Sequence, residues 1–325
     1  MKGRKHRIRT IVLLLFIQVL ISTFQVLAVE EQAENTVIIV SSSDDLQHEI
    51  DNAADHSTIR LLPGIYRQQI LIHKPVLISG YSKENTRFIV TTEKNKPAIT
   101  ITASYTNLEN ISVINDGPGI YTTGIRTIAD HTTINNCIIE KTPVGIALWS
   151  SNNVIRNSLF RECTDEGIVI ISSSYKEANN NLIEGCIFID NCDGIELQES
   201  CYNIIRNCHF EDNTHDGIDA ISSNNDNNLI IKCTIINNEV HGIYFSNSLN
   251  NVIQDCVVAE NTDGDILFTS FEQSNTVSNV TFSLQSIDEQ NDVKSVETMA
   301  KDFRGQLIDR VVWIFSSLST IFSFS

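Results

Sequence analysis

Basic residues are scarce in this chain, and their scarcity excludes several classes of partner. The 325 residues contain 23 Lys and Arg against 40 Asp and Glu, which gives a formal net charge of −17. Between Asn107 and Gln285 the imbalance is sharper, with 7 basic residues against 24 acidic ones. Nucleic acids and anionic membrane surfaces bind proteins through clustered Lys and Arg, so both are poor partners for this chain. A polyanionic substrate is repelled as well, unless a divalent cation bridges it to the protein.

A helical hydrophobic period is also absent between residues 120 and 270, where a short repeat occupies the chain instead. Each copy is a variant of one pattern, Gly-Ile-x-Leu, a turn, Asn-x-Ile-x-x-Cys and a second turn, and its apolar residues alternate as in a half-buried strand. Copies of 21 to 27 residues are too short for a βαβ unit and bury their apolar side only by stacking on the next copy. The sequence therefore predicts an all-β fold, a single right-handed parallel β-helix or solenoid whose coils lie about 4.8 Å apart. The copies begin at Gly124, Gly145, Gly167, Gly194, Gly217, Gly242 and Gly264.

Equivalent residues of successive copies are expected to stack in columns along the solenoid. An Ile follows each of the first six glycines, but Asp265 follows Gly264, so the last copy is expected to be frayed or shifted in register. Five cysteines share one inward column, where free thiols act as small apolar fillers: Cys137, Cys186, Cys208, Cys233 and Cys256. Cys163, Cys192 and Cys201 fall in turns, and a Cys163–Cys192 disulfide is left open. An asparagine column is interpreted as turn positions with unusual dihedral angles: Asn191, Asn213, Asn238 and Asn261.

The N-terminal residues have the pattern of an export signal. Residues 1–28 place five basic residues before an apolar run and end in the small-residue cleavage sequence Val26-Leu27-Ala28; an uncleaved anchor is the alternative. Removal of this signal peptide takes away five positive charges and no negative ones, so the net charge of −17 becomes −22. The sequence thus predicts an exported protein, located in the periplasm, at the cell surface or outside the cell.

Both ends of a solenoid need a cover, because they expose core and unpaired strand edge. After an acidic linker at 29–36, residues 37–106 are predicted to form an N-terminal cap and the first coils. The cap is a helix that begins at Ser42 or Ser43 and carries on one side Leu46, Ile50, Ala53 and Ala54. The β-helix repeats are predicted over 107–285.

The C-terminal end has a different composition from the repeats. A polar linker is predicted at 286–306 and an apolar or amphipathic helix at 307–325. Val311 to Ser325 carries no charge, but its 15 residues are fewer than the ~20 that a membrane-spanning helix needs. The helix is predicted either to cap the solenoid or to associate with a membrane surface, and the oligomeric state is left open.

Two stretches of the chain resemble known families. Thr58-Ile59-Arg60-Leu61-Leu62-Pro63-Gly64-Ile65-Tyr66 is similar to the entry of pectin-lyase-like folds, and Asp193-Gly194-Ile195-Glu196-Leu197 with Asn203-Ile204-Ile205-Arg206-Asn207-Cys208 resembles the repeats of the NosD family. The resemblance covers about residues 37–285 and implies the parallel β-helix fold. It also implies copper handling, if copper ligands are present. They are sparse, because the chain after residue 28 has one Met and no clustered His, so copper is an unlikely cofactor.

The densest group of chemically active residues lies on and beside the strands that follow the glycines. The outward column two residues after each glycine reads Arg126, Ala147, Val169, Glu196, Asp219, Tyr244 and Ile266. Glu196 and Asp219 fall one coil apart and are the candidate catalytic pair, because two carboxyls ~5 Å apart serve a retaining glycosidase. The candidate substrate-binding residues are Asp193, Asp216, His215, His241 and Tyr244. The candidate calcium ligands are Asp193, Glu196, Asp216 and Asp219, which supply the oxygen atoms that calcium prefers.

A simpler interpretation competes with a site: acidic residues that flank glycines are common turn formers, and duplication repeats them into a solvated acidic face. The predicted function is therefore an exported β-helix that binds glycans or cations, or is structural, at the cell envelope, with a polysaccharide or envelope glycan as partner. The alternative is a carbohydrate-active enzyme, a glycoside hydrolase, lyase or epimerase, and the second alternative is NosD-like copper handling. Whether the chain is an enzyme is left open, because one fold hosts many functions.

Overall fold

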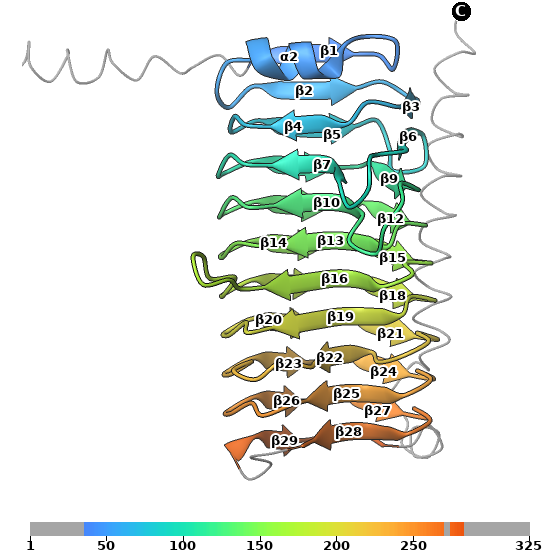
Figure 1. The fold of residues 1–325 in the computed structure, drawn as a ribbon, viewed down its shortest axis with the longest axis vertical. Coiled ribbons are helices and arrows are strands. Elements are labelled where there is room, and N and C mark those ends of the chain that lie inside the picture. Colours follow the sequence, from blue (N-terminus) through green and yellow to red (C-terminus); the bar gives the residue numbers. More distant parts are fainter. Residues whose placement is uncertain (1–35, 270–273, 283–325) are drawn as a thin grey trace, which may run out of the picture. The chain divides into compact units, whose positions relative to one another are not determined.

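The computed structural model describes residues 36–269 and 274–282. In these ranges the chain forms a right-handed parallel β-helix, in which successive coils add strands to three sheets (Figure 1). The predicted fold class is confirmed. The predicted signal peptide, the linker at 286–306 and the helix at 307–325 lie outside the described residues. No helix in the described part of the chain is long and apolar enough to cross a membrane.

Each sheet runs the length of the stack. The first sheet contains β1 (Val37–Val40), β2 (Thr58–Leu61), β5 (Leu77–Gly80), β8 (Asn107–Glu109), β11 (Thr133–Asn135), β14 (Val154–Arg156), β17 (Leu182–Glu184), β20 (Ile204–Arg206), β23 (Leu229–Ile231), β26 (Val252–Gln254) and β29 (Thr276–Ser278). The second contains β3 (Gly64–Tyr66), β6 (Thr86–Val90), β9 (Ser112–Asn115), β12 (Ile138–Glu140), β15 (Leu159–Arg161), β18 (Ile187–Ile189), β21 (His209–Glu211), β24 (Thr234–Ile236) and β27 (Val257–Ala259). The third contains β4 (Ile70–Ile72), β7 (Pro97–Ile101), β10 (Thr123–Thr127), β13 (Val144–Leu148), β16 (Glu166–Ile171), β19 (Asp193–Gln198), β22 (Ile218–Ala220), β25 (His241–Phe245) and β28 (Gly264–Phe268).

The core consists of like residues stacked on like residues, as predicted. On the third sheet one Ile of each coil lies opposite the Ile of the next, and all are fully buried: Ile125, Ile146, Ile168, Ile195, Ile218 and Ile243. On the second sheet the rings of Phe160 and Phe188 stack with centroids 4.8 Å apart, and those of Phe188 and Phe210 lie 4.7 Å apart. Burial of each such side chain contributes roughly 1.5–3 kcal/mol, so the stack itself stabilises the register.

The glycine at the head of each repeat has a steric cause. Gly194 on β19 faces the backbone of the next coil, and a Cβ atom built on it would lie 2.5 Å from the carbonyl oxygen of Gly217. The same Cβ would lie 2.5 Å from the ring of Phe210. A larger residue at this position would therefore force neighbouring coils apart, and only glycine fits.

The predicted shift of the last coil is confirmed by its strand pairing. Ile266 lies opposite Ile243 and Gly264 opposite His241, so the last repeat is displaced by one residue and Leu267, not the predicted Ile266, continues the outward column. The Asp265 carboxylate accepts a hydrogen bond of 2.9 Å from the side-chain amide of Asn261. Asp265 thus ends the row of stacked asparagine side chains to which Asn261 belongs. It does not place a charge among the isoleucines.

That row corrects the interpretation of the asparagine column. The four asparagines are buried and have ordinary dihedral angles; the left-handed residues are others, such as Asn207 and Asn237. Each column member donates from its side-chain amide to the side-chain oxygen of the next, over 3.0 Å for Asn191–Asn213, 2.8 Å for Asn213–Asn238 and 2.7 Å for Asn238–Asn261. The column is an internal amide ladder, which satisfies polar groups where the chain turns inside the core.

The eight cysteines, all within the described residues, are free thiols. The five of the inward column are buried, as predicted, and burial raises the pKa of Cys137 to about 12. The Cys163–Cys192 disulfide is absent. Cys163 lies in the asparagine column, where its N–H donates to the Asn191 side chain, and Cys192 lies one residue beyond that column.

The N-terminal cap is a helix, as predicted, but its boundaries differ. Helix α2 spans Leu46–Asn52, and its N-cap is Asp45, whose carboxylate accepts from the His48 N–H, instead of Ser42 or Ser43. Leu46 and Ile50 are fully buried, and Ala53 ends the helix as its C-cap. Ala54 lies beyond the helix and is exposed, so the predicted apolar side was one residue too long.

Candidate functional site

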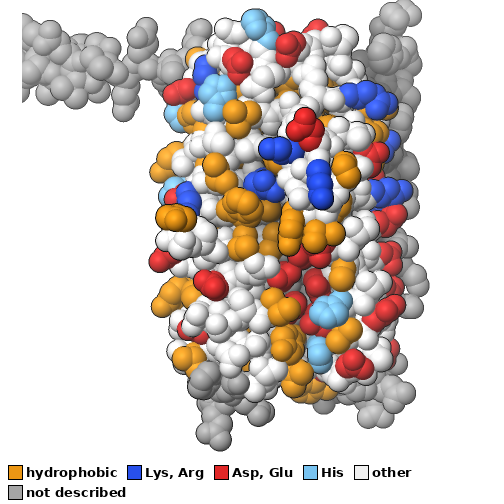
Figure 2. All heavy atoms as spheres, in the orientation of Figure 1, with side chains coloured by type: hydrophobic (Ala, Val, Ile, Leu, Met, Phe, Trp, Pro, Cys, Tyr) orange, Lys and Arg blue, Asp and Glu red, His pale blue; other side chains and the backbone are white. Residues whose placement is uncertain are grey.

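The outer face of the third sheet holds the candidate site. Its central column runs Arg126, Ala147, Val169, Glu196, Asp219 and Tyr244, in the predicted order, one residue on each successive coil. Figure 2 shows this face: Lys and Arg gather over the earlier coils, hydrophobic side chains lie in the middle, and Asp, Glu and His gather over the later coils. The face therefore divides into a basic, an apolar and an acidic zone along the stack.

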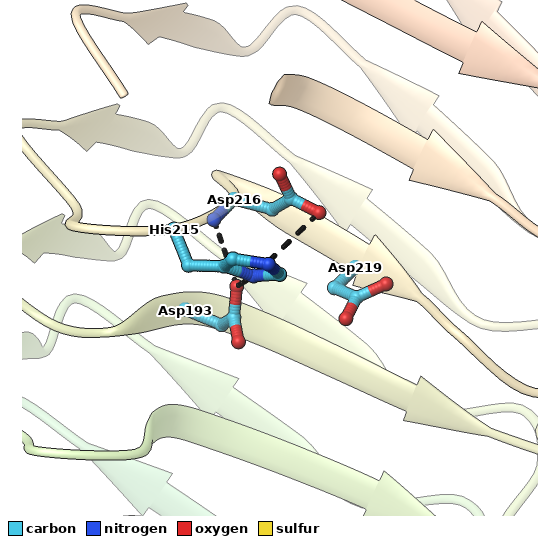
Figure 3. A group of neighbouring side chains, drawn as sticks. All are labelled: Asp193, His215, Asp216 and Asp219. Carbon is cyan, nitrogen blue, oxygen red and sulfur yellow. Dashed lines mark hydrogen bonds and ion pairs between the residues drawn. The ribbon is translucent and has the colours of Figure 1, made fainter. Parts of the chain in front are cut away.

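Four side chains of the acidic zone converge on one point, and we call them the carboxylate cluster: Asp193, His215, Asp216 and Asp219. One ligand atom of each lies within 4.8 Å of those of the others (Figure 3). Asp193 begins β19, Asp219 lies on β22, and His215 and Asp216 belong to the turn that leads into β22. The chain brings them together because the turn before β22 lies one coil beyond the start of β19.

Hydrogen bonds fix three of the four cluster residues. The His215 Nδ1 atom lies 2.7 Å from Asp193 Oδ1, and the same oxygen accepts the Asp216 N–H over 2.8 Å. Asp216 Oδ1 in turn accepts the His241 N–H over 2.7 Å and lies 3.1 Å from His241 Nδ1. Asp219 differs, because it is 2% exposed and its Oδ1 atom has no hydrogen-bond partner among the described residues. An unpartnered buried carboxylate oxygen is costly unless a proton or a cation occupies its site.

The electrostatics of the cluster follow from burial and crowding. Burial, with the neighbouring charges of Asp193 and Asp216, raises the pKa of Asp219 to about 8. Burial also raises the pKa of Asp193. At His215 burial acts to lower the pKa, but the hydrogen bond and charge of Asp193 outweigh it and the pKa is raised. Each shift favours bound protons, which is the behaviour of a site that holds positive charge.

A second group of carboxyls adjoins the cluster on the preceding coils. Burial and a hydrogen bond with Glu196 raise the pKa of Glu166 to about 10, and burial with the charges of Glu196 and Asp193 raises that of Asp165 to about 6. Glu196 lies opposite Asp219 in register and accepts a hydrogen bond from the Gln198 side chain. On the other side of Asp219, the His241 and Tyr244 rings stack with centroids 5.5 Å apart.

The structure thus places the predicted residues in one patch, but groups them differently from the sequence. His215, predicted to bind substrate, stands in the cluster of potential metal ligands, and Glu196, predicted as a calcium ligand, stands outside that group of four and pairs with Glu166. Asp165 and Glu166 were not predicted as site residues. The sequence did contain a signal for them: Asp165 and Glu166 directly precede a repeat glycine, as acidic residues also do before Gly194 and Gly217.

A cavity of about 680 Å³ opens beside this face, at the turns that connect the second sheet to the third. Its walls include Asp116, Thr142, Cys163 and Asn191, and none of the cluster residues line it. We place the candidate site on the sheet face and not in this cavity, because the buried carboxyls with raised pKa values converge there.

Comparison with known proteins supports the fold. The family described as right handed beta helix region matches residues 97–227 and 144–292, more than half of the chain, and the chain belongs to this family. No curated protein is significantly similar to the chain in sequence. Among solved structures it is similar to pectate lyase Pel9A, with 15% identity, a TM-score of 0.54 and coverage of 76% of this chain and 77% of that one.

Two further structures are similar at the same level. One is the A-module of the mannuronan C-5 epimerase AlgE6 from Azotobacter vinelandii, with 14% identity, a TM-score of 0.51 and coverage of 73% of this chain and 94% of that one. The other is the tailspike protein gp49 from Acinetobacter baumannii bacteriophage Fri1, a capsular polysaccharide depolymerase, with 13% identity, a TM-score of 0.53 and coverage of 76% and 51%. At these identities the likeness shows the shared fold alone.

Proposed function

We propose that this protein binds a carboxylated polysaccharide on the outer face of the third sheet, through a divalent cation held by the carboxylate cluster. The observation that carries the proposal is Asp219 Oδ1, which is buried with no hydrogen-bond partner among the described residues and lies close to Asp193, His215 and Asp216. Carboxylate oxygens are the ligands of calcium, so Asp193, Asp216 and Asp219 are the proposed ligands. His215 holds Asp193 in place by its hydrogen bond.

The charge of the protein favours a bridging cation over direct contact. A carboxylated sugar chain meets the carboxyls of Asp165 and Glu196 next to the cluster, and like charges repel strongly in a poorly solvated site. A bound cation reverses the local sign and leaves coordination positions for sugar oxygens. The pectate lyase, the mannuronan epimerase and the capsular polysaccharide depolymerase of similar fold carry names of polysaccharide substrates, which supports a glycan as ligand.

A second candidate function is catalysis on the same polysaccharide. Asp219, with its pKa raised to about 8, is protonated at neutral pH and suits a general acid, and Glu196 lies opposite it on the preceding coil. His241 and Tyr244 stand on the far side of Asp219 as further proton-transfer groups. In this case Glu196→Gln abolishes turnover of a polyuronate without changing cation binding, whereas a binding protein shows no turnover before or after the substitution.

The test of the primary proposal is a titration of the metal-free protein with calcium, followed by isothermal calorimetry. We expect one calcium per chain, with binding weakened at least tenfold in Asp219→Asn and Asp216→Asn, and polygalacturonate or polymannuronate binding only after calcium is added. The matched control is Asp55→Asn, an exposed carboxylate outside the sheet face. Manganese and zinc are titrated in parallel, because an imidazole in the cluster favours transition metals if His215 turns toward the ion. Absence of binding for all three cations defeats the proposal.

We further propose that the protein acts outside the cytoplasm, because residues 1–28 have the pattern of a signal peptide. N-terminal sequencing of protein recovered from the producing cells tests this: a chain that begins near residue 29 supports export, and a chain that retains Met1 in the cytoplasmic fraction contradicts it.

A further inference from the structure

Arg126 is a half-buried cation with no counter-ion in the part of the chain that the structure describes. It lies on β10 in the central column of the candidate face, and no carboxylate of the described residues lies within ion-pair distance of it. Among the described residues its buried Nε atom has no hydrogen-bond partner, and its Nη2 atom donates to the Tyr121 carbonyl over 3.4 Å and the Thr123 hydroxyl over 3.2 Å. Burial lowers the pKa of Arg126. A guanidinium has five N–H donors, so several are free to bind an anion.

Trp149 gives this guanidinium a fixed orientation. The central guanidinium carbon of Arg126 lies 4.6 Å from the centroid of the Trp149 ring, which comes from the coil that follows. This cation–π contact restricts the rotation of the long side chain and leaves one guanidinium edge for a ligand. Trp149 is 41% exposed and presents apolar surface beside the cation. An exposed aromatic ring next to an oriented guanidinium matches a carboxylated sugar, which has an apolar C–H face and an anionic group.

An apolar floor connects Arg126 to the acidic zone. Ala147 and Val169 occupy the central column between Arg126 and Glu196, and with Val144 and Ile171 they form a small hydrophobic cluster on the outside of the sheet. Figure 2 shows hydrophobic side chains between the basic and the acidic zones of this face. Four strand spacings separate Arg126 from Asp219, about 19 Å along the stack. A single sugar cannot reach both, but an oligosaccharide that lies along the stack can.

We propose that Arg126 and Trp149 form a distal subsite for the acidic polysaccharide, in which Arg126 binds the carboxylate of one sugar and Trp149 contacts its ring. The chain of sugars then crosses the apolar floor, and a second carboxylate reaches the cation at the carboxylate cluster. This inference rests on the proposed function, since it assigns a second contact to the same ligand. The distal subsite makes the protein selective for longer sugar chains, because a ligand that reaches both contacts binds more strongly than one that reaches either alone.

The experiment measures oligogalacturonates of two and eight residues by calorimetry on the calcium-loaded full chain. Removal of a charge-assisted hydrogen-bonded contact is expected to weaken octamer binding about 10- to 100-fold in Arg126→Met, which keeps the aliphatic stem, with no change in dimer or calcium binding. Arg126→Lys is expected to recover part of the lost octamer affinity, because lysine restores the positive charge but not the paired N–H donors of a guanidinium. The control is Arg156→Met, an exposed arginine on β14 in the first sheet, which leaves all three affinities unchanged.

A second readout is the fluorescence of Trp149, measured with Arg126 and Trp149 unchanged. Trp149 and Trp313 are the two tryptophans, so in a Trp313→Phe background the fluorescence reports on Trp149 alone. The octamer is expected to change this fluorescence and the dimer is not. If Arg126→Met binds octamer as the parent does, or the octamer leaves Trp149 fluorescence unchanged while it binds, the distal subsite is wrong and the cation site stands. If the parent binds calcium but no octamer, or binds neither, the subsite fails together with the proposed function.

Discussion

Replacement of Asp219 by asparagine is expected to stabilise the metal-free protein at alkaline pH, although it removes a site residue. The pKa of Asp219 is raised from 3.8 to about 8 in the folded protein, so the folded state holds a proton that the unfolded state releases. A carboxyl of this kind contributes stability below pH 3.8, and that contribution is lost as the pH rises toward 8. At 1.36 kcal/mol per pH unit, the loss has an upper limit of about 5 kcal/mol at pH 8. Asparagine stays neutral and escapes the loss.

The titratable groups near Asp219 also make the folded protein less stable as the pH rises. The pKa values of Asp193, of Asp165 (about 6) and of Glu166 (about 10) are also raised, so the parent loses stability through more than one proton over this range. The raised pKa of His215 has the same sign, because its protonated form stabilises the fold below pH 6.5 and is lost at higher pH. The stability of the Asp219→Asn variant therefore still depends on pH, but its unfolding releases about one proton fewer than that of the parent.

The assay is urea denaturation between pH 4 and pH 9, once with EDTA and once with saturating calcium. With EDTA at pH 8 we expect the variant to be more stable than the parent by a few kcal/mol, and at pH 4 the two to be nearly equal. Calcium is expected to reverse the order at pH 8, since it stabilises the parent and has little effect on the variant. Asp55→Asn serves as the control. A variant less stable than the parent with EDTA at pH 8, or an unchanged pH slope, would refute the assignment of a strained carboxylate to Asp219.

Three further predictions concern the scaffold. Asn213→Ala removes a member of the amide ladder and is expected to cost at least ~2 kcal/mol in urea denaturation, because buried polar neighbours lose their partners, while Asn107→Ala on the exposed side of β8 changes stability by less than ~0.5 kcal/mol. Iodoacetamide at pH 8 is expected to label the partly exposed Cys192 and Cys201 slowly and the other six cysteines only after unfolding, as mass spectrometry can count; labelling of six buried thiols in the native state would contradict the packing. Phe188→Ala is expected to cost about 3–5 kcal/mol, since it interrupts the ring stack between two coils, and a cost below ~1 kcal/mol would exclude a tight stack.

Sequence alone determined the scaffold of this protein, because the repeat and the coil have the same length. The isoleucines that follow Gly124 through Gly242 stack as expected, since parallel pairing places each on its equivalent in the next coil. For the same reason the order of the central column, including Glu196 beside Asp219, could be read from spacing. The one-residue shift at Asp265 could be detected as a break in the pattern, but not interpreted.

Which side chains converge depends on the folded arrangement of the coils and their turns. His215 joins Asp193 because the turn before β22 directs its ring back to the preceding coil, and no periodicity encodes the direction of a turn side chain. The interpretation of the asparagine column as turn residues with unusual dihedral angles is wrong for a similar reason. Spacing gives the residue type at each position, whereas the hydrogen-bond partner depends on how far each side chain reaches toward the next coil. That Arg126 has no counter-ion within residues 36–269 and 274–282 is also a tertiary property, since it depends on every described segment folded around the guanidinium.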